Sequence, residues 1–148
     1  DLIEPLRNVI AQGRPFLGIC LGYQVLFQYS EEDHTECLGI LDGRVVRFPD
    51  DLTDAEGKKL KIPQMGWNAA RFEGNHPVWE GIAEGSEFYF VHSYYPTPLP
   101  EQICATTDYG LDFASGVLSR SLVAFQFHPE KSGRPGLKLL ENFCNWNP

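Results

Sequence analysis

Apolar residues recur with helical periodicity near the two ends of the chain. The first set is Leu2, Ile3, Leu6, Val9 and Ile10. This spacing predicts an amphipathic helix, and Gly13 stands where such a helix takes its left-handed stop. The second set lies in the segment 136–146, and its apolar side consists of Leu137, Leu140 and Cys144 with Leu139 and Phe143 beside them. Pro135, near the first turn, supports a helix there as well.

Short apolar runs between these two segments predict strands. The run 15–19 is too brief for a helix, which favours a buried strand that leads into Cys20. A helical stretch follows at about 21–29, and helix, strand and helix in this order are typical of a parallel α/β layer. Further strand-like runs lie at 38–41, 44–48, 68–72, 87–91, 103–107, 113–118 and 122–127.

No internal repeat or long linker divides the chain, so we expect one α/β domain over residues 1–148. The polar segment 49–61 is predicted to be a surface excursion. The opening helix normally follows a strand, and the only methionine is Met65. We therefore expect an N-terminally truncated domain whose first strands are missing.

The charge balance argues against nucleic acid as a partner. The chain has 148 residues, with 12 Lys and Arg against 20 Asp and Glu, which gives a net charge of −8. Binding to a phosphate backbone requires a basic surface. No apolar run approaches the ~18 residues of a membrane span, and no signal-peptide pattern opens the chain. We expect no membrane contact and a cytoplasmic location.

The cysteines carry no sign of a disulfide framework or a zinc site. The four residues Cys20, Cys37, Cys104 and Cys144 are scattered without a CxxC pair. We expect reduced thiols, no metal and no cofactor. Cys37, Cys104 and Cys144 are interpreted as buried structural residues, because free cysteine is among the most buried residue types.

Cys20 differs from the others because it lies in the sequence GxCxG, between Gly18 and Gly22 at a strand-to-helix junction. This pattern has the form of a nucleophile elbow with a thiol in place of a hydroxyl. The helix N-terminus is expected to lower the pKa of the thiol, and the N–H of Leu21 to stabilise a developing oxyanion. The alternative is a buried strand cysteine between two incidental glycines.

A base and an orienting acid for this thiol are predicted at the end of the last strand. His128 follows the apolar run 122–127, and Pro129 and Glu130 come next. Pro129 favours extended backbone at His128, so positions 128 and 130 are expected to project to the same side. A carboxylate there holds one imidazole tautomer and leaves the other nitrogen for the thiol. The alternative is a turn with a solvated charge.

Gln24 lies four residues after Cys20, one turn along the same helix face. Its carboxamide is a candidate for binding a small polar substrate; the alternative is a solvent-facing side chain. The acidic loop that follows holds Glu31, Glu32, Asp33 and Glu36. A carboxylate close to the site would attract an ammonium group, and the alternative is a solvated turn.

At this point the motifs resemble a known family. GICLGYQ at 18–24 and FHPE at 127–130 are similar to the class I, triad-type glutamine amidotransferases. PQMGWN at 63–68 and YFVHSYY at 89–95 resemble, more narrowly, the glutaminase subunits of imidazole glycerol phosphate synthases, in histidine biosynthesis. The resemblance covers essentially the whole chain, with four separated motifs in the right order. It implies a three-layer sandwich around a central mixed, partly parallel sheet.

The resemblance also implies the reaction. Cys20 would attack the side-chain amide of glutamine and form a thioester, His128 would protonate the departing ammonia, and water activated by His128 would release glutamate. Gln24 and Glu32 match positions that bind glutamine, and His92, Ser93 and Tyr94 would line the pocket from the side.

The implied partner is a (β/α)₈-barrel cyclase that receives the ammonia. Three aromatic residues are candidates for contact with it, or else ordinary core residues: Trp67, Tyr89 and Phe90. In one departure from the family pattern, Gln64 stands where His is common. In another, the family's first strands and its glycine-rich PGxG loop would lie upstream of Asp1. The alternatives are a catalytically silent domain that acts as a binding module, another class I glutamine amidotransferase, or another cysteine hydrolase.

Overall fold

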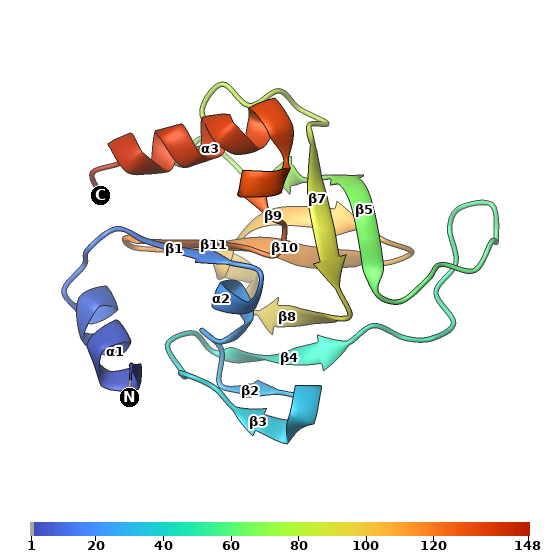
Figure 1. Ribbon diagram of the computed structural model, residues 1–148, viewed down its shortest axis with the longest axis horizontal. Helices are drawn as coiled ribbons and strands as arrows, with labels where there is room; N and C mark the ends of the chain where they lie inside the picture. Colours follow the sequence, from blue (N-terminus) through green and yellow to red (C-terminus); the bar gives the residue numbers. More distant parts are fainter. Residues whose placement is uncertain (1) are drawn as a thin grey trace.

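A five-stranded sheet forms the centre of the fold in the computed structural model, which describes residues 2–148 (Figure 1). The strand order is β1-β11-β10-β9-β6, with β1 and β11 parallel and the other pairs antiparallel. The strands are β1 (Phe16–Ile19), β6 (Arg71–Phe72), β9 (Ile103–Asp108), β10 (Asp112–Ser119) and β11 (Leu122–Phe125).

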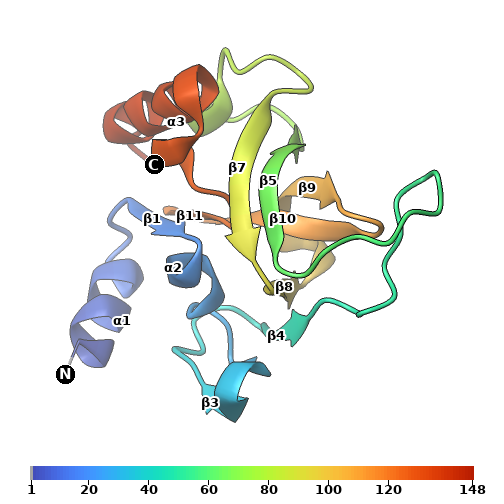
Figure 2. The ribbon, with the colours of Figure 1, turned by 45° about the vertical axis from the view of Figure 1, so that its right-hand side comes forward.

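Two smaller sheets flank the central one. The first has the order β3-β2-β4-β8, with β2 and β4 parallel, and the second is the antiparallel pair β5-β7. Their strands are β2 (Tyr29–Ser30), β3 (Thr35–Glu36), β4 (Gly43–Arg47), β5 (Gln64–Ala69), β7 (Glu87–His92) and β8 (Tyr94–Pro98). Figure 2 shows β5 and β7 side by side in front of the central sheet.

Helices cover both faces of the central sheet (Figure 1). The α-helices are α1 (Ile3–Ala11), α2 (Leu21–Gln24) and α3 (Gly133–Asn145), and short 3₁₀ turns lie at Glu32–His34, Pro77–Trp79, Pro100–Gln102 and Pro129–Lys131. Every residue of β11 is buried, and alternate residues enter different clusters. Val123 packs in the cluster that contains Leu139 of α3. Ala124 packs in the cluster that contains Tyr23 of α2. The predicted α/β fold with a mixed, partly parallel sheet is confirmed.

Two predictions between residues 21 and 41 were wrong for one reason. The helix expected at 21–29 ends after Gln24, and the run 38–41 is not a strand. The N–H of Leu38 donates to Val25 O at 2.8 Å, and the N–H groups of Ile40 and Leu41 donate to Leu26 O at 2.8 and 2.9 Å. The run 38–41 thus occupies the carbonyl groups that a longer helix would have used.

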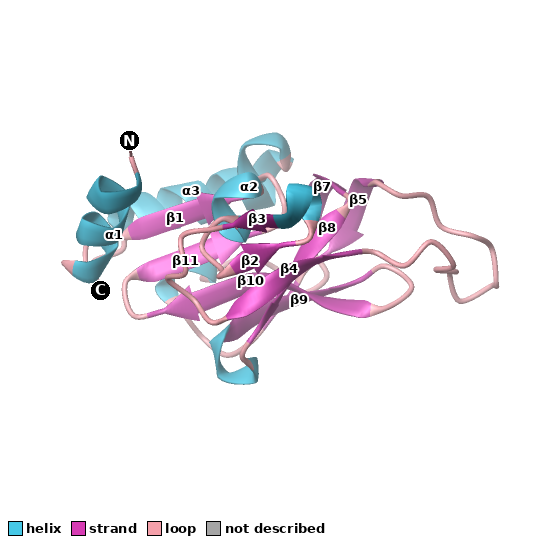
Figure 3. Ribbon diagram, turned by 90° about the horizontal axis from the view of Figure 1, so that it is seen from below, coloured by secondary structure: helices cyan, strands magenta, loops and turns pink. Residues whose placement is uncertain are grey.

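Strand β8 was not predicted as a strand because Pro96 and Pro98 interrupt its pattern. It lies at an edge of its sheet, beside β4 only, where a residue without an N–H is tolerated. The segment 49–61 is the surface excursion that was predicted, and it projects from one end of the molecule (Figures 2 and 3).

The apolar faces of the two long helices are less buried than their periodicity predicts. In α1, Val9 is 38% exposed and no residue is fully buried. In α3, Leu139 is buried, but Leu137 is 62% exposed and Cys144 is also exposed. The helix turns Gly136 and Leu139 toward the core, so the predicted side formed by Leu137 and Cys144 faces outward.

Candidate active site

Cys20 occupies a strained turn between β1 and α2. Its backbone has φ +51° and ψ −106°, in the left-handed half of conformational space that a residue with a Cβ rarely adopts. The Cys20 N–H donates to Phe125 O at 2.9 Å, and its carbonyl accepts from the N–H groups of Tyr23 and Gln24 at 3.0 and 3.1 Å. The turn is therefore fixed from the strand side and from the helix side. This conformation is the one expected of a nucleophile elbow.

Only the first glycine of the GxCxG motif is required by sterics. A Cβ on Gly18 would lie 2.6 Å from the carbonyl oxygen of Gly22 and 2.9 Å from Cβ of Ala124. A Cβ on Gly22 would have no heavy atom within 4 Å. The close approach is made by the backbone of Gly22 toward the bare Cα of Gly18.

The prediction of a lowered pKa for Cys20 was wrong. Burial raises the pKa of the Cys20 thiol, and this effect outweighs the backbone N–H of Leu21, which acts in the opposite direction. The carboxylate of Glu130 raises the pKa further, whereas the side chains of Gln126 and Lys131 lower it. Helix α2 has only four residues, so its N-terminus offers little compensation.

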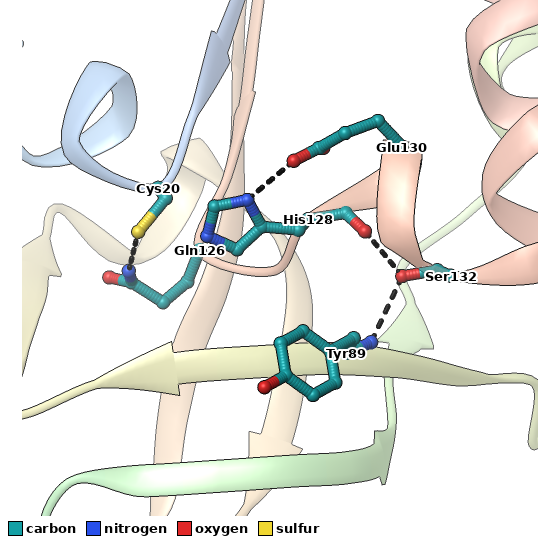
Figure 4. A network of polar contacts seen from close by, with 6 residues as sticks. All are labelled: Cys20, Tyr89, Gln126, His128, Glu130 and Ser132. Carbon is teal, nitrogen blue, oxygen red and sulfur yellow. Dashed lines mark hydrogen bonds and ion pairs between the residues drawn. The ribbon is translucent and has the colours of Figure 1, made fainter.

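His128 and Glu130 form the pair that the HPE sequence predicts. Nδ1 of His128 lies 2.6 Å from Oε1 of Glu130, and the His128 side chain is 17% exposed. Figure 4 shows the other ring nitrogen, Nε2, on the side that faces the Cys20 sulfur. Within residues 2–148 the sulfur has no hydrogen bond to this ring and accepts one from Gln126 instead. Such catalytic contacts often tighten only when substrate is bound.

Contacts with Tyr89 and Ser132, which sequence reasoning missed, hold the backbone of His128. The His128 N–H donates to Tyr89 O at 2.9 Å. The hydroxyl of Ser132, which is fully buried, donates to His128 O at 2.5 Å and accepts from the Tyr89 N–H at 2.9 Å (Figure 4). Ser132 thus joins β7 to the turn that carries His128 and Glu130. No sequence pattern marks this contact, because it spans 43 positions.

Gln24 is buried rather than solvent-facing. It is 6% exposed, and its Nε2 donates to Tyr94 O at 2.9 Å and to Oε1 of Gln126 at 3.1 Å. Gln126 is fully buried and donates from Nε2 to the Cys20 sulfur at 3.7 Å. The structure therefore connects Gln24 to the Cys20 sulfur through a second glutamine that was not among the predicted residues.

His92 lies in the core behind Tyr94. It is 7% exposed, and burial lowers its pKa to about 4. Its Nδ1 lies 2.7 Å from Tyr94 O and its Nε2 lies 2.8 Å from the side-chain amide of Gln64. The Gln64 amide in turn contacts the amide of Asn68 at 2.9 Å. Gln64 is thus a fully buried partner of His92, and both ring nitrogens of His92 are occupied by protein groups.

The other predicted substrate-binding residues are placed less tightly. Ser93 is half-buried and its carbonyl accepts from the Phe48 N–H at 3.0 Å. Tyr94 is half-buried at the start of β8. Glu32 is exposed in the 3₁₀ turn after β2, and its N–H donates to the hydroxyl of Ser30 at 3.1 Å. The roles of these residues in binding glutamine stay predictions.

The three aromatic candidates for partner contact separate into two groups. Trp67 is 49% exposed on β5, next to Tyr89, with ring centroids 6.0 Å apart. Phe90 is fully buried in the larger core cluster, so its interpretation as a core residue holds. Met65, on the same outer face of β5, is 65% exposed. Leu21, next to Cys20 at the start of α2, is 62% exposed.

Other features of the described chain lie away from these residues. A cavity of about 750 Å³ is lined by residues between Ala70 and Gly85 and includes none of the predicted site residues. Residues 2–148 contain no cluster of His, Cys, Asp and Glu that could hold a metal ion. None of the helices in that range is both long and apolar enough to cross a bilayer. Of the remaining cysteines, Cys104 is buried as expected, but Cys37 is only half-buried and Cys144 is exposed.

Comparison with known proteins defines the class. The family of class-I glutamine amidotransferases matches residues 1–146, and the chain belongs to this family. Imidazole glycerol phosphate synthase subunit HisH of Methylococcus capsulatus is 54% identical over 149 residues, which cover 99% of this chain and 69% of that protein. The same subunit of Thiobacillus denitrificans is 52% identical, covering 97% of this chain and 65% of that protein. The narrower resemblance carried by PQMGWN and YFVHSYY is thereby confirmed.

The chain spans about two thirds of the length of these relatives. Solved structures show the same fold. A glutamine amidotransferase from Thermotoga maritima matches with a TM-score of 0.64 and 17% identity, covering 97% of this chain and 52% of that one. A further solved glutamine amidotransferase matches with a TM-score of 0.64 and 21% identity, covering 97% of this chain and 68% of that one.

Proposed function

We propose that residues 1–148 act as a single glutamine amidotransferase domain that hydrolyses glutamine and passes the ammonia to a cyclase subunit of imidazole glycerol phosphate synthase. One observation carries the proposal: Cys20 lies on a strained elbow, and His128, oriented by Glu130, turns its free ring nitrogen toward the sulfur. A nucleophile, a base and an orienting acid form the arrangement that covalent acyl transfer requires.

In the proposed reaction, His128 takes the proton of the Cys20 thiol and the sulfur attacks the side-chain carbonyl carbon of glutamine. The tetrahedral oxyanion is stabilised by the N–H of Leu21. His128 then gives its proton to the nitrogen, the C–N bond breaks, and ammonia departs. A glutamyl thioester remains on Cys20. Water loses a proton to His128 and attacks the thioester; the C–S bond breaks, and glutamate and the thiol are formed. Glu130 holds Nδ1 of His128 throughout.

Gln24 supports the choice of glutamine as substrate. Both donors of its amide nitrogen are occupied, by Tyr94 O and by Gln126, whereas its Oε1 accepts no hydrogen bond within residues 2–148. A fixed acceptor beside the thiol suits an amide or ammonium group of the substrate. In this proposal Glu32, Ser93 and Tyr94 complete the binding of glutamine. His92 acts from behind, through its contact with the Tyr94 carbonyl.

The surface next to this site supports a partner. Leu21, Met65 and Trp67 are large apolar side chains exposed on α2 and β5, and aromatic residues and Met are enriched in protein interfaces. Ammonia loses its nucleophilicity once it is protonated in bulk water, which favours transfer inside a complex. The proposed partner is a (β/α)₈-barrel cyclase, and the proposed location is the cytoplasm.

The test measures glutamate release from glutamine, with and without the cyclase subunit, for the unchanged chain, Cys20→Ala and Cys144→Ala. Cys144 is an exposed thiol and serves as the matched control. We expect Cys20→Ala to abolish release and Cys144→Ala to retain it. Glutamate release by Cys20→Ala at the unchanged rate would end the proposal. Complex formation without covalent labelling of Cys20 by a glutamine-like electrophile would instead identify a silent binding module.

A further inference from the structure

A row of buried polar side chains connects the Cys20 sulfur to the start of β8. Gln126 is fully buried and Gln24 is 6% exposed, and the two amides contact each other at 3.1 Å. Gln126 is flanked in the sequence by Phe125 and Phe127, which are both fully buried. An uncharged polar side chain in such surroundings is costly unless its hydrogen bonds are satisfied. The position of Gln126 therefore calls for a specific explanation.

The hydrogen bonds determine which way each amide points. The Tyr94 carbonyl can only accept, so the Gln24 nitrogen must face it, at 2.9 Å. The same nitrogen faces the Gln126 amide at 3.1 Å, so that contact requires the oxygen of Gln126. With its oxygen committed to Gln24, Gln126 can present only its N–H₂ group to the sulfur, 3.7 Å away. The Tyr94 carbonyl thus orients the amide of Gln24, which in turn orients the Gln126 amide so that its N–H₂ group faces the sulfur.

We propose that Gln126 is a positioning residue for Cys20: its amide N–H, oriented by Gln24 and the Tyr94 carbonyl, holds the sulfur and stabilises its anionic form. The reaction that this serves rests on the proposed function, but the effect on the sulfur does not. The backbone of Gln126 is itself anchored, because its N–H donates to Ser115 O at 2.9 Å. The donor is therefore fixed before any substrate arrives.

A glutamine suits this position better than other side chains of its size. Methionine would fill the same volume but donate nothing to the sulfur and accept nothing from Gln24. Glutamate would keep the shape but replace the donor by a carboxylate oxygen. Burial already raises the pKa of Cys20, and the other charged or titratable groups near the sulfur are His128, Glu130 and Lys131. Of these, the carboxylate of Glu130 disfavours the thiolate, and the hydrogen bond from the neutral Gln126 amide acts against this effect.

The same row of contacts also orients the substrate-facing atom of Gln24. Because the nitrogen of Gln24 is held by both Tyr94 O and Gln126, its free oxygen has one direction. Gln126 therefore connects the group that would bind glutamine to the atom that would attack it. The amide of Gln64 lies further from the sulfur along these contacts: it contacts His92, whose Nδ1 lies 2.7 Å from Tyr94 O, and it contacts neither Gln24 nor Gln126.

The experiment measures the pH dependence of Cys20 alkylation by iodoacetamide in the full chain, with the labelled Cys20 peptide quantified by mass spectrometry. For Gln126→Met we expect the midpoint to move up by about one pH unit, the size expected for loss of a hydrogen bond to a charged group. Gln126→Glu should move it further in the same direction. Gln64→Met is the matched control, a fully buried glutamine whose loss should leave the midpoint in place.

An unchanged midpoint in Gln126→Met or Gln126→Glu would overturn the inference, as would an equal shift in Gln64→Met, which would indicate general loosening of the core. Urea unfolding establishes that each variant is folded, and if Gln126→Met does not fold, Gln126→Glu decides alone. Alkylation requires no glutamine. If the unchanged chain releases no glutamate but the Gln126 variants have a shifted midpoint, the proposed function is rejected and the inference is retained. If the unchanged chain releases glutamate but the midpoint does not shift, the inference is rejected and the proposed function is retained.

Discussion

The backbone carbonyl of Tyr89 accepts a hydrogen bond from the backbone N–H of His128 at 2.9 Å. This contact fixes the proposed base against β7, on the strand that pairs with β5. The ring of Tyr89 also touches Trp67 on the outer face. A partner that binds Trp67 would therefore be separated from His128 only by Tyr89. Binding of the partner could thus change the position of His128 through this one residue.

The two glycines of the elbow should respond differently to alanine. A Cβ on Gly18 would overlap the Gly22 carbonyl at 2.6 Å, so we expect Gly18→Ala to destabilise the chain by about 1–3 kcal/mol and to displace Cys20. Gly22→Ala meets open space in a helix and should be neutral or stabilising by up to about 1 kcal/mol. Urea unfolding of both variants checks this. Equal losses of stability would contradict the steric argument.

Removing the hydroxyl of Ser132 should loosen His128. Ser132→Ala leaves the partly buried Tyr89 N–H without its acceptor, which we expect to cost about 1–3 kcal/mol in the free energy of unfolding. The half-buried Ser86, whose hydroxyl donates to Ala83 O in an exposed hydrogen bond of 2.7 Å, provides the control. Ser86→Ala should change stability by less than about 0.5 kcal/mol. Denaturant titration and kcat for glutamine decide whether stability and activity fall together.

Glu130→Gln should separate the reactivity of the thiol from catalysis. The carboxylate raises the pKa of Cys20, so its neutralisation should shift the pH profile of Cys20 alkylation downward. At the same time Nδ1 of His128 loses its charged partner, and we expect kcat for glutamine to fall by about 10²–10⁴-fold. Alkylation profiles and glutamate release, measured on the same preparation, check both parts. An alkylation midpoint that moved up while glutamate release fell would show instead that Glu130 acts mainly by supporting the thiolate.

His92 should make the chain less stable in mild acid. Burial lowers its pKa to about 4, whereas in the unfolded chain the value is near 6.5. Between these values the unfolded chain binds a proton that the folded chain does not. The stability that depends on neutral His92 is therefore fully present above about pH 6.5. It is lost as the pH falls toward 4, by roughly 3 kcal/mol in total.

His92→Gln should flatten the pH dependence of the free energy of unfolding in this range. His34→Gln is the control, because His34 lies on the exposed 3₁₀ turn. Some slope will remain from His76, whose pKa burial also lowers. A dependence as steep in His92→Gln as in the unchanged chain would show that His92 is not its source.

Trp67→Ala should weaken binding to the cyclase subunit with little effect on folding. An aromatic anchor at an interface typically contributes about 2 kcal/mol or more, or roughly 30-fold in Kd. Trp67 is 49% exposed, so its removal should hardly change the urea midpoint. Phe90→Ala, one strand away but fully buried, should lose about 3–5 kcal/mol of stability. Calorimetric titration with the cyclase subunit gives the binding constants, and an unchanged Kd for Trp67→Ala would exclude this face.

Local sequence patterns correctly predicted the elements whose structure is determined by their own residues. The run 15–19, the strands 103–107 and 113–118 and the HPE turn carry their own signals of burial or geometry, and the structure has them close to the expected bounds. The exposed face of α3 was mispredicted because periodicity shows where apolar residues gather, not which of them meets a neighbour. Helix α2 was overestimated because its carbonyl groups bind residues 38–41, a contact that no local pattern encodes.

The same limit applies to the site. Cys20, His128 and Glu130 were recognisable as candidates because strand-end motifs place them. Ser132 and Gln126 were not, because their roles depend on partners that are 43 and 106 positions away. The lowered pKa expected for Cys20 failed for a related reason: the helix N-terminus is visible in the sequence, but the extent of burial around the sulfur is not.

The parallel pairing of β1 with β11 joins the first described strand to the last one. Closing so long a loop is entropically expensive, so this pair is expected to form late during folding. A growing polypeptide that has not yet supplied β11 carries the sulfur without an imidazole, a carboxylate or an amide to serve it. The proposed base, its orienting acid and the amide donor therefore reach the sulfur only after the last strand has been made, and the assembly of these groups reports that β1 and β11 have paired.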